Sequence, residues 1–301
     1  MEQNYGDTKI MRPLLDADVL LYEVGYSSQT RDAGFWVPRS WDWCQELFDK
    51  KVALICDEVR ATEAPTLFLT NTPYISNLLN RKRKWEGEES IVEYIPNFRE
   101  SLSTTGYKQG RKEEKPIHFK NLVAYMFSEY DVHVSENGLE ADDALCIRQM
   151  SADPFGSTVI CSRDKDLRQC SGWHYSWECG KQNAIGPVFV EQPGWIELQL
   201  KVNEKGKRLP PKLFGYGHKF FYAQLLMGDC VDTIKGAKGL GAVKAFAILE
   251  PLRTEEEMLE AVTKIYKDIY KEEAEKVFRE QADLLWMIRK MKDGEPVRWR
   301  M

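Results

Sequence analysis

Short apolar runs that end in polar residues recur along the chain. Three of them are Met11–Asp16, Pro65–Asn71 and Thr158–Ser162. Each is too short for an ordinary helix and rich in branched or aromatic residues, as strands buried on both faces are. We therefore predict three buried strands, each ending in a polar side chain.

Helical patterns fill the segments between these strands, over Arg39–Thr62, Phe119–Tyr130 and Gly138–Met150. Strands that alternate with helices indicate an α/β fold with a mainly parallel central sheet flanked by helices. Functional residues gather at the carboxyl ends of such strands. The polar residues that end them are therefore candidates for a site.

The last third of the chain is mostly helical. The expected helices are Gly217–Met227, Ala242–Leu249, Thr254–Tyr270 and Glu272–Met291. We predict an α/β core over residues 1–210, with a basic insertion at about 72–120, and a helical region over 211–301 packed on that core. Arg81–Lys120 is polar and has little apolar periodicity, which predicts either a solvated loop or a mobile basic element that grips a substrate.

Composition limits the class of protein and the kind of metal site. The 301 residues are 43% hydrophobic, which indicates a folded globular protein. No apolar run approaches the roughly 20 residues that cross a membrane, and residues 1–9 are polar, so we expect a soluble intracellular protein. The seven cysteines form no C-x-x-C pair and the four histidines are dispersed. The cysteines are expected to be reduced thiols, and any metal ligands must be oxygens.

The net charge of −5 does not indicate a nucleic-acid partner, because proteins that bind nucleic acids are usually basic. Lysines and arginines nevertheless cluster in Arg81–Lys84, Lys108–Lys120 and Lys201–Lys219. A basic surface can therefore coexist with an acidic site.

Acidic residues stand in four motifs, most of them directly after apolar segments. They are Asp16 in LLDAD, Glu140, Asp142 and Asp143 in EADD, Asp164 and Asp166 in DKD, and Asp229 and Asp232 in DCVD. Each motif alone has a structural explanation. Asp18 is the expected N-cap of the following helix, EADD complements a helix dipole, and DKD is an ordinary turn.

Together, eight carboxylates would repel one another strongly without cations. Mg²⁺ and Mn²⁺ prefer carboxylate and water ligands, and two such ions about 4 Å apart can drive phosphodiester hydrolysis. The pattern therefore predicts a divalent-metal hydrolase. On these grounds alone, calcium or a purely structural metal stays open.

A Gly-rich turn follows Asp232 and leads into the helix that begins at Ala242. Its glycines Gly236, Gly239 and Gly241 allow close backbone approach, and helix N-terminal amides can hold a phosphate. Positive charge comes from Lys235, Lys238 and Lys244. The turn predicts contacts with a phosphate backbone and not with bases.

These motifs resemble the flap endonuclease and 5′–3′ exonuclease family, especially its tailed-phage members and the nuclease domain of bacterial DNA polymerase I. The most specific segments are GLEADDAL (138–145), VICSRDKDL (159–167) and LLMGDCVDTIKGAKGLGAVKA (225–245). The last is similar to the family's helix–three-turn–helix. The resemblance runs from Leu14 to about Leu249 and implies a PIN-like fold and metal-dependent cleavage near a free or flapped 5′ end.

The resemblance also implies roles for individual residues. The first metal would be bound by Asp16, Glu140, Asp142 and Asp143, and the second by Asp164, Asp166, Asp229 and Asp232. A basic arch for single-stranded substrate would contain Tyr107, Lys108, Arg111 and Lys112, with Lys108 and Arg111 as phosphate clamps. A K⁺ ion would suit Gly236–Gly241.

Two departures from the family pattern stand out. Asn71 replaces the usual aspartate at the end of the second strand, where its amide oxygen can hold a metal-bound water but supplies less charge. About 25 residues, Thr72–Pro96, are inserted before the arch and include RKRK and Trp85. This insertion either extends the DNA-binding surface or packs against it.

We thus expect a monomeric nuclease in the cytoplasm (of the host cell, if a phage encodes it) that acts on DNA with 5′ ends or flaps and also on RNA in RNA/DNA hybrids. Two alternatives stay open. One is a PIN-type ribonuclease, against which the helix–three-turn–helix argues. The other is a DNA-binding relative that has lost its metal site, for which Asn71 is the one hint.

Overall fold

The computed structural model describes residues 11–108, 114–180, 182–200, 202 and 206–300. They fall into two compact units. Unit 1 takes the described residues of 11–96, 114–164 and 172–188, and unit 2 takes those of 97–108, 165–171 and 189–300. We describe each unit by itself. The domain boundaries expected from the sequence stay a prediction.

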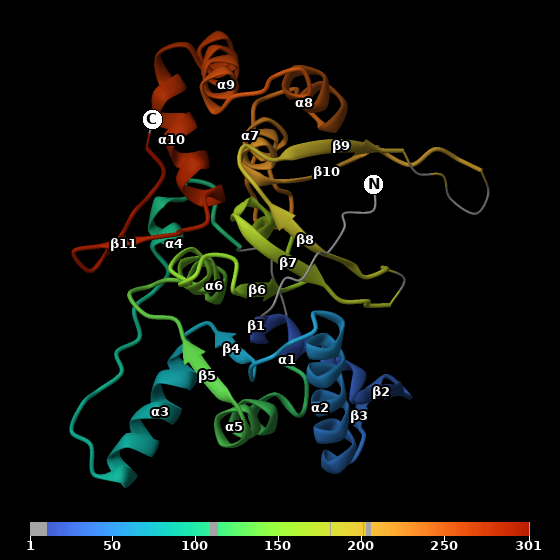
Figure 1. Ribbon diagram of the computed structural model, residues 1–301, viewed down its shortest axis with the longest axis vertical. Coiled ribbons are helices and arrows are strands. Elements are labelled where there is room, and N and C mark those ends of the chain that lie inside the picture. Colours follow the sequence, from blue (N-terminus) through green and yellow to red (C-terminus); the bar gives the residue numbers. More distant parts are fainter. Residues whose placement is uncertain (1–10, 109–113, 181, 201, 203–205, 301) are drawn as a thin grey trace. The chain divides into compact units, whose positions relative to one another are not determined.

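The central sheet confirms the expected α/β fold. Its order is β5 (Asp131–Val134), β4 (Thr66–Leu69), β1 (Arg12–Asp16), β6 (Thr158–Cys161), β7 (Gly172–Ser176) and β8 (Ile185–Val190). The first five strands are parallel to one another. β1 lies between β4 and β6, so its Leu14 pairs with both Thr66 and Ile160 (Figure 1). The three strands expected from apolar runs are therefore neighbours at the centre of the sheet.

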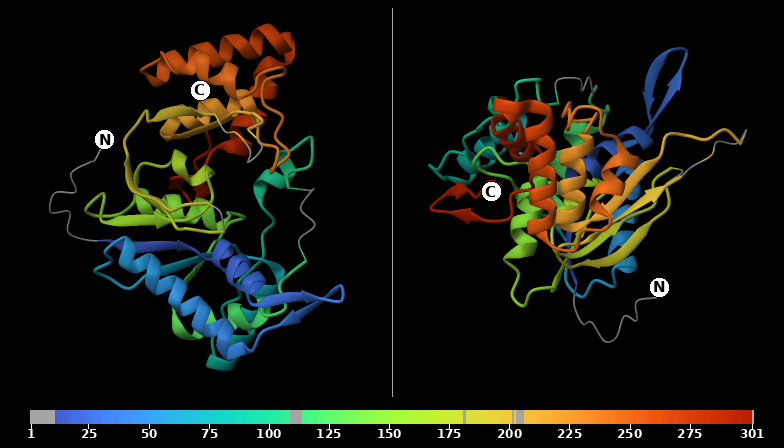
Figure 2. Two further views of the ribbon diagram at one scale, coloured as in Figure 1. Left: turned by 90° about the vertical axis from the view of Figure 1, so that its right-hand side faces the viewer. Right: turned by 90° about the horizontal axis from the view of Figure 1, so that it is seen from above.

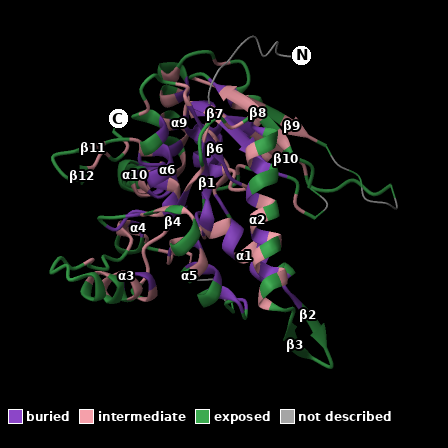
Figure 3. Ribbon diagram, turned by 60° about the horizontal axis from the view of Figure 1, so that its bottom comes forward, coloured by how far each residue is buried: buried purple, intermediate pink, exposed green. Residues whose placement is uncertain are grey.

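The core of unit 1 explains why the middle residues of these strands are apolar. Side chains alternate between the two faces of a strand, so Leu15, Leu67 and Cys161 share one face. That face packs against α1 (Ala17–Ser27), α2 (Trp41–Glu58) and α5 (Phe119–Glu129). The helix α6 (Ala141–Met150) packs against β1, β4 and β6. In Figure 3, these three strands are coloured as buried.

The loop expected over Arg81–Lys120 is wrong at its beginning, because α3 (Pro73–Glu86) continues through RKRK. Thr72 caps this helix by accepting from the Ile75 amide at 3.3 Å, and Gly87 ends it in a left-handed conformation. Apolar residues anchor only its first turns, which is why the second half shows no periodicity. A short helix, α4 (Phe98–Leu102), follows in unit 2.

Several hairpins escaped the sequence pattern because their strands are short and because, except at the end of β10, few of their residues are buried. They are β2 (Gln29–Asp32) with β3 (Phe35–Pro38), β9 (Trp195–Gln199) with β10 (Lys212–Tyr216), and β11 (Met291–Lys292) with β12 (Glu295–Pro296). The expected helix Glu272–Met291 is shorter: a 3₁₀ turn, η2 (Lys271–Glu273), precedes α10 (Ala274–Leu285). Trp286 leaves the helix in an extended conformation, and the Arg289 guanidinium stacks on its ring.

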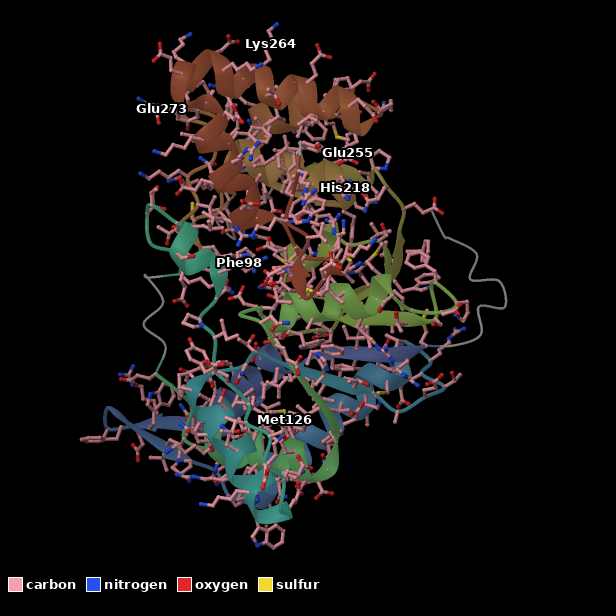
Figure 4. The ribbon with its side chains drawn as sticks, turned by 90° about the vertical axis from the view of Figure 1, so that its left-hand side faces the viewer. Phe98, Met126, His218, Glu255, Lys264 and Glu273 are labelled. Carbon is pink, nitrogen blue, oxygen red and sulfur yellow. The ribbon has the colours of Figure 1, made fainter. Side chains whose placement is uncertain are left out.

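Unit 2 has its own core, built from α7 (Gly217–Met227), α8 (Ala242–Leu249), α9 (Glu255–Tyr270) and α10. These helices lie side by side in both views of Figure 2. His218 and Glu255 join the N-termini of α7 and α9 through a 2.8 Å contact between Nδ1 and Oε2 (Figure 4). No helix in the described part of the chain is long and apolar enough to span a membrane.

All seven cysteines are free, as expected. Four are buried, Cys56 and Cys179 are half-buried, and Cys230 is exposed. None of them stands among the acidic motifs except Cys230, which follows Asp229 directly.

Candidate metal centre

Asp16 ends β1 and begins α1. Its side chain accepts a hydrogen bond from the Val19 amide at 3.1 Å, so Asp16 is the N-cap of that helix. The expectation that Asp18 caps the helix is wrong, because the strand passes directly into the helix and Asp18 falls in its first turn. Asp18 instead accepts from the Thr70 amide at 3.2 Å.

A chain of hydrogen bonds brings three elements together around Asp18. Thr70 follows β4, and its hydroxyl accepts a 2.8 Å hydrogen bond from the Ala141 amide at the start of α6. The Thr70 amide in turn donates to Asp18. The ends of β1 and β4 and the N-terminus of α6 therefore meet, as expected for motifs at the carboxyl ends of parallel strands.

The EADD motif forms the N-terminus of α6. Glu140 is the N-cap, and its amide donates to the Asp143 carboxylate at 3.3 Å. Asp143 is fully buried, whereas Glu140 and Asp142 are half-buried. This contact gives Asp143 a capping role in the fold. Asp142 lies between these two residues in the sequence.

A second chain of hydrogen bonds links Asp16 to β6. The Ser162 hydroxyl donates to Asp16 at 2.6 Å and accepts from the Asp164 amide at 2.9 Å. Burial, and then the negative charges of Asp18 and Asp164, raise the pKa of Asp16 to about 7. The Ser162 and Val19 hydrogen bonds oppose this shift but do not overcome it. Three acidic side chains thus act on one another at the sheet's carboxyl end.

The remaining acidic motifs lie in unit 2, where a lysine compensates them. Lys165 Nζ is 2.9 Å from Asp166 Oδ1 and also pairs with Asp229 Oδ2. Burial alone would lower the pKa of Lys165, but the charges and hydrogen bonds of these aspartates raise it. Burial would raise the pKa of Asp229, but the Lys165 contact and the Val231 amide lower it. The Lys165 ammonium group therefore bridges the Asp166 and Asp229 carboxylates.

Asp232 lies in the same loop as Asp229, and the start of the expected arch packs against it. The Lys108 amide donates to the Asp232 carbonyl at 3.5 Å, and the Thr105 hydroxyl donates to the Thr233 carbonyl at 3.0 Å. Tyr107 is buried, and Lys108 Nζ lies 4.8 Å from its ring centre. Arg111 and Lys112, the other expected arch residues, lie outside the described residues.

The Gly-rich turn joins α7 to α8 and folds back on itself. The Asp229 and Ile234 amides each donate to the other's carbonyl, at 2.8 and 2.7 Å. The Gly236 carbonyl accepts from the Tyr270 hydroxyl at 3.0 Å and from Gln281 Nε2 at 3.3 Å. The Gly236 carbonyl oxygen thus already accepts two hydrogen bonds, and the K⁺ expectation stays a prediction.

The basic residues of this turn are presented to solvent. Lys235, Lys238 and Lys244 are exposed, as are Gly239 and Gly241, the N-cap of α8. Lys244 Nζ donates to the Gly239 carbonyl at 2.9 Å, which places its charge beside the start of α8. Exposed amides and ammonium groups at a helix N-terminus suit a phosphate.

Asn71 serves the fold of unit 1. Its Oδ1 accepts from the Ser76 hydroxyl at 2.8 Å, and its Nδ2 donates to the Glu93 carbonyl at 3.3 Å. The side chain therefore ties α3 to the segment that follows it. A water-mediated metal contact of Asn71 stays a prediction.

The donor set of unit 1 fits a hard divalent cation in its chemistry, since it consists of carboxylates and hydroxyls. The raised pKa of Asp16 reflects its burial first and then the negative charges of Asp18 and Asp164, which a bound cation would offset. Among the described residues, no three His, Cys, Asp or Glu side chains stand close enough together to hold an ion as they are.

Sequence reasoning missed four residues of these networks. Thr70 and Ser162 carry no distinctive pattern, because single hydroxyl residues after strands are common. Asp18 was assigned to a cap, although its place in LLDAD put it two residues from Asp16. Lys165 stands between two aspartates in DKD, and that spacing was a usable signal.

No family model matches the chain. It is 27% identical to DNA polymerase I of Deinococcus radiodurans over 191 residues, which is 61% of this chain and 18% of that protein. It is also 27% identical to DNA polymerase I of Bacillus subtilis over 188 residues, 58% of this chain and 19% of that protein. The resemblance to bacterial DNA polymerase I is confirmed. The chain spans less than a fifth of the length of these two relatives.

Solved structures were compared as well. The bacteriophage T5 flap endonuclease with DNA and metal ions gives a TM-score of 0.41 at 10% identity, covering 91% of this chain and 98% of that one. The catalytic core of Rad2 with DNA substrate gives 0.41 at 12% identity, covering 88% and 66%.

Proposed function

We propose that this chain is a divalent-metal-dependent nuclease that hydrolyses DNA phosphodiesters near 5′ ends, as a 5′–3′ exonuclease or flap endonuclease. Two lines support the proposal. Carboxylates lie close together at the carboxyl ends of the central strands. In addition, more than half of this chain is similar in sequence to bacterial DNA polymerase I.

The observation that carries the proposal is the state of Asp16. This carboxylate is 1% exposed, and burial, followed by the charges of Asp18 and Asp164, raises its pKa to about 7. Burying a carboxylate beside two others is costly to a fold and is typical of sites that bind cations. A purely structural role for Asp16 would need only its cap contact with Val19.

The metal ligands proposed are the acidic residues of each unit. Unit 1 would offer Asp16, Glu140, Asp142, Asp143 and Asp164, and unit 2 would offer Asp166, Asp229 and Asp232. Mg²⁺ or Mn²⁺, when bound, supplies Lewis-acid activation of water and neutralises charge that develops on the phosphate. K⁺ bound in the Gly-rich turn is a further, separate proposal.

The chain's own residues have tasks besides holding ions. Lys108 would hold the phosphate to be cleaved, together with Arg111, whose place is outside the described residues. Lys235, Lys238 and Lys244, with the amides at the N-terminus of α8, would hold a more distant phosphate of the same substrate. Carboxylates that accept hydrogen bonds from Ser162 and from backbone amides are kept oriented for their role.

The deciding experiment is cleavage of 5′-labelled duplex and flap DNA in Mg²⁺, Mn²⁺ or EDTA. We expect products in either metal, none in EDTA, and a loss of about 10²-fold or more for Asp142→Ala and Asp164→Ala. Asp42→Ala, which removes an exposed carboxylate from the first turn of α2, is the matched control and should cleave normally. A double variant of Asp142 and Asp164 that still digests DNA in Mg²⁺ would refute the proposal.

Parallel substrates separate the remaining alternatives. RNA/DNA hybrids test the wider substrate range, and cleavage of single-stranded RNA alone would favour a PIN-type ribonuclease. Calorimetry with Mn²⁺ tests the non-catalytic alternative, because a relative that has lost its metal site should show no binding.

A further inference from the structure

The far end of α3 combines positive charge with an exposed aromatic ring. The helix is anchored in unit 1 through Ile75 and Ser76, which are buried, and its last turns extend beyond them. Arg81, Lys82 and Lys84 are exposed there, and Trp85 is 89% exposed. No other of the nine tryptophans is as exposed.

Helical spacing gathers these residues on one side. Residues three and four apart share a face of a helix, so Arg81, Lys84 and Trp85 point in similar directions. Arg83 points elsewhere: its Nε lies 3.7 Å from Glu88 Oε2, and its guanidinium donates to the Ser90 hydroxyl at 3.2 Å. In the described part of the chain, no ion pair involves Arg81, Lys82 or Lys84.

Stability of the helix does not explain this set. Positive charge near a helix C-terminus complements the dipole, but one or two groups in the last turn supply that effect. Arg83 and Lys84 already lie there. Trp85 contributes no burial to the core, and a large exposed apolar ring on a polar helix end has no role in folding.

We propose that this surface, Arg81, Lys82, Lys84 and Trp85, binds single-stranded DNA. The three cations would contact successive phosphates, and the Trp85 indole would stack on an unpaired base. Basic side chains beside an exposed aromatic ring are the combination by which proteins bind single strands without regard to sequence. A duplex keeps its base faces stacked, so the ring specifically favours an unpaired strand.

The surface extends the nuclease proposed above, because a 5′ flap or frayed end is single-stranded. This inference rests on the proposed nuclease function, but the experiment that tests binding does not depend on cleavage. The α3 surface would also explain the insertion Thr72–Pro96, which would bind the unpaired part of the substrate.

The first test measures binding of fluorescently labelled single-stranded and duplex DNA by anisotropy in EDTA. Trp85→Ala should weaken single-strand binding by about five- to a hundredfold and leave duplex binding unchanged. Trp85→Phe keeps a ring that can stack and should retain most of the affinity. Equal single-strand affinity of wild type and Trp85→Ala would overturn the proposal.

The second test separates charge from stacking through salt dependence. The triple variant Arg81→Ala, Lys82→Ala, Lys84→Ala should reduce the slope of log affinity against log salt for single strands by about 2, since each phosphate contact contributes about 0.7. Trp85→Ala should leave that slope unchanged. Lys264→Ala with Lys267→Ala, on the exposed side of α9 (Lys264 in Figure 4), is the charge control and should lower the slope by much less.

The two proposals can fail separately. A wild type that cleaves 5′-ended DNA while the variants bind single strands normally would overturn the α3 surface alone. A wild type that binds single strands through Trp85 but never cleaves would overturn the nuclease alone. Because these residues lie on an exposed helix end, the variants should melt at the wild-type temperature, and melting curves check this. Weakened capture of an acidic protein with unchanged DNA binding would assign the surface to a protein partner and overturn the DNA proposal.

Discussion

The surroundings of Asp16 act in opposite directions on the ionisation of its carboxyl group. Its position as the N-cap of α1 and its contact with Ser162 favour an ionised carboxylate. Burial and the nearby charges of Asp18 and Asp164 favour the protonated form, and they prevail, raising the pKa to about 7. The ionised Asp16 carboxylate therefore lowers the stability of the folded protein above about pH 7.

This conflict predicts a stability difference that depends on pH. The unfolded chain releases the Asp16 proton near 3.8 and the folded chain near 7, so the folded state binds more protons between these values. Stability of the metal-free protein must therefore fall as pH rises from about 4 to 7. Asp16→Asn removes this loss and should be more stable than wild type by about 2–4 kcal/mol at pH 8 in EDTA.

Urea denaturation in EDTA at a series of pH values measures the difference. The advantage of Asp16→Asn should shrink as the pH falls and approach zero below about pH 4, where both states become protonated. Asp42→Asn, on the exposed first turn of α2, should follow wild type at every pH. Parallel curves for wild type and Asp16→Asn would contradict the prediction.

At this scale the sequence located the acidic residues but not their contacts. Apolar runs ending in Asp16 or followed by Asp164 indicated strand ends, and the parallel sheet brings those ends together. The sequence could not show that Ser162 would join the two aspartates, because that contact depends on the register of β1 and β6. For the same reason it could not show that the Asn71 amide would bind Ser76 and Glu93.

Among the elements, the loop after α7 and the turn that carries DKD share one ion pair. Lys165 pairs with Asp166 and with the nearly buried Asp229, and its own side chain is 41% exposed. The lysine thus supplies positive charge to these two carboxylates within unit 2. We infer that a divalent cation bound by Asp166 and Asp229 competes with this ammonium group.

Lys165→Met tests that competition. Removing the cation leaves Asp229 buried without its partner, so the metal-free protein should lose about 1–3 kcal/mol, a range lowered for the exposure of the lysine. Mg²⁺ should then restore more stability to the variant than it adds to wild type, by linkage. Urea denaturation with and without Mg²⁺ gives both quantities.

A double-mutant cycle provides the control. Adding Asp229→Asn to Lys165→Met removes the uncompensated charge and should recover part of the loss in EDTA. Unchanged stability of Lys165→Met, or an equal gain from Mg²⁺ in both proteins, would rule out the competition.

The turn between α7 and α8 depends on one close backbone approach. Gly236 has φ +66°, and a Cβ there would lie 2.2 Å from the backbone nitrogen of Gly228. Gly236→Ala should therefore cost about 3–5 kcal/mol, from the left-handed conformation and the clash together. Gly239 has φ +80° but nothing within 4 Å of its Cβ position, so Gly239→Ala should cost only about 1–2 kcal/mol.

Thermal and urea unfolding compare the two variants directly. Equal losses would show that the approach of Gly236 to Gly228 does not govern the turn. The sequence revealed these glycines as a flexible turn, but it could not rank them, because the ranking depends on which neighbour each one meets.

Elements with strong periodicity were predicted well, and the reason lies in burial. The central strands β1, β4 and β6 are buried on both faces, and α2, α5 and α6 each bury one side against them. The hairpins and the far half of α3 are held by turns, caps and local contacts, which leave no apolar period in the sequence. The α3 surface was consequently visible as RKRK but not as a helix.

For the whole molecule, the two units are not two consecutive halves of the chain, because unit 2 contains segments from three separate parts of the sequence. The core of unit 1 uses residues from 11 to 179, and the core of unit 2 uses residues from 196 to 299 together with Leu102 and Tyr107. The chain thus enters unit 2 three separate times. Helical periodicity alone marks only its last part, which is why the sequence predicted a boundary at residue 210.

Unit 2 therefore should not fold from its helical part alone. A fragment of residues 211–301 contains β10 but lacks β9, to which β10 is paired from Lys212 to Tyr216. It also lacks Gln169, whose Nε2 donates to Gln224 at 2.8 Å and to the Leu285 carbonyl at 3.0 Å. In the fragment, the Gln224 side-chain oxygen and the Leu285 carbonyl therefore lose the hydrogen bond that Gln169 donates to each of them.

The same fragment loses the segment 97–108, which closes the core from another side. Arg99 is fully buried and donates to the Trp286 carbonyl at 2.7 Å, and Tyr107 belongs to the apolar core. A longer fragment, 189–301, restores β9 but neither Gln169 nor this segment. We expect both fragments to retain helical circular dichroism with poorly dispersed amide resonances and no cooperative melting, as in compact states that lack specific packing. Cooperative melting of the 211–301 fragment with dispersed resonances would show instead that its helices form a domain by themselves, and the contacts from Arg99, Tyr107 and Gln169 would then be additions to a fold that is already complete.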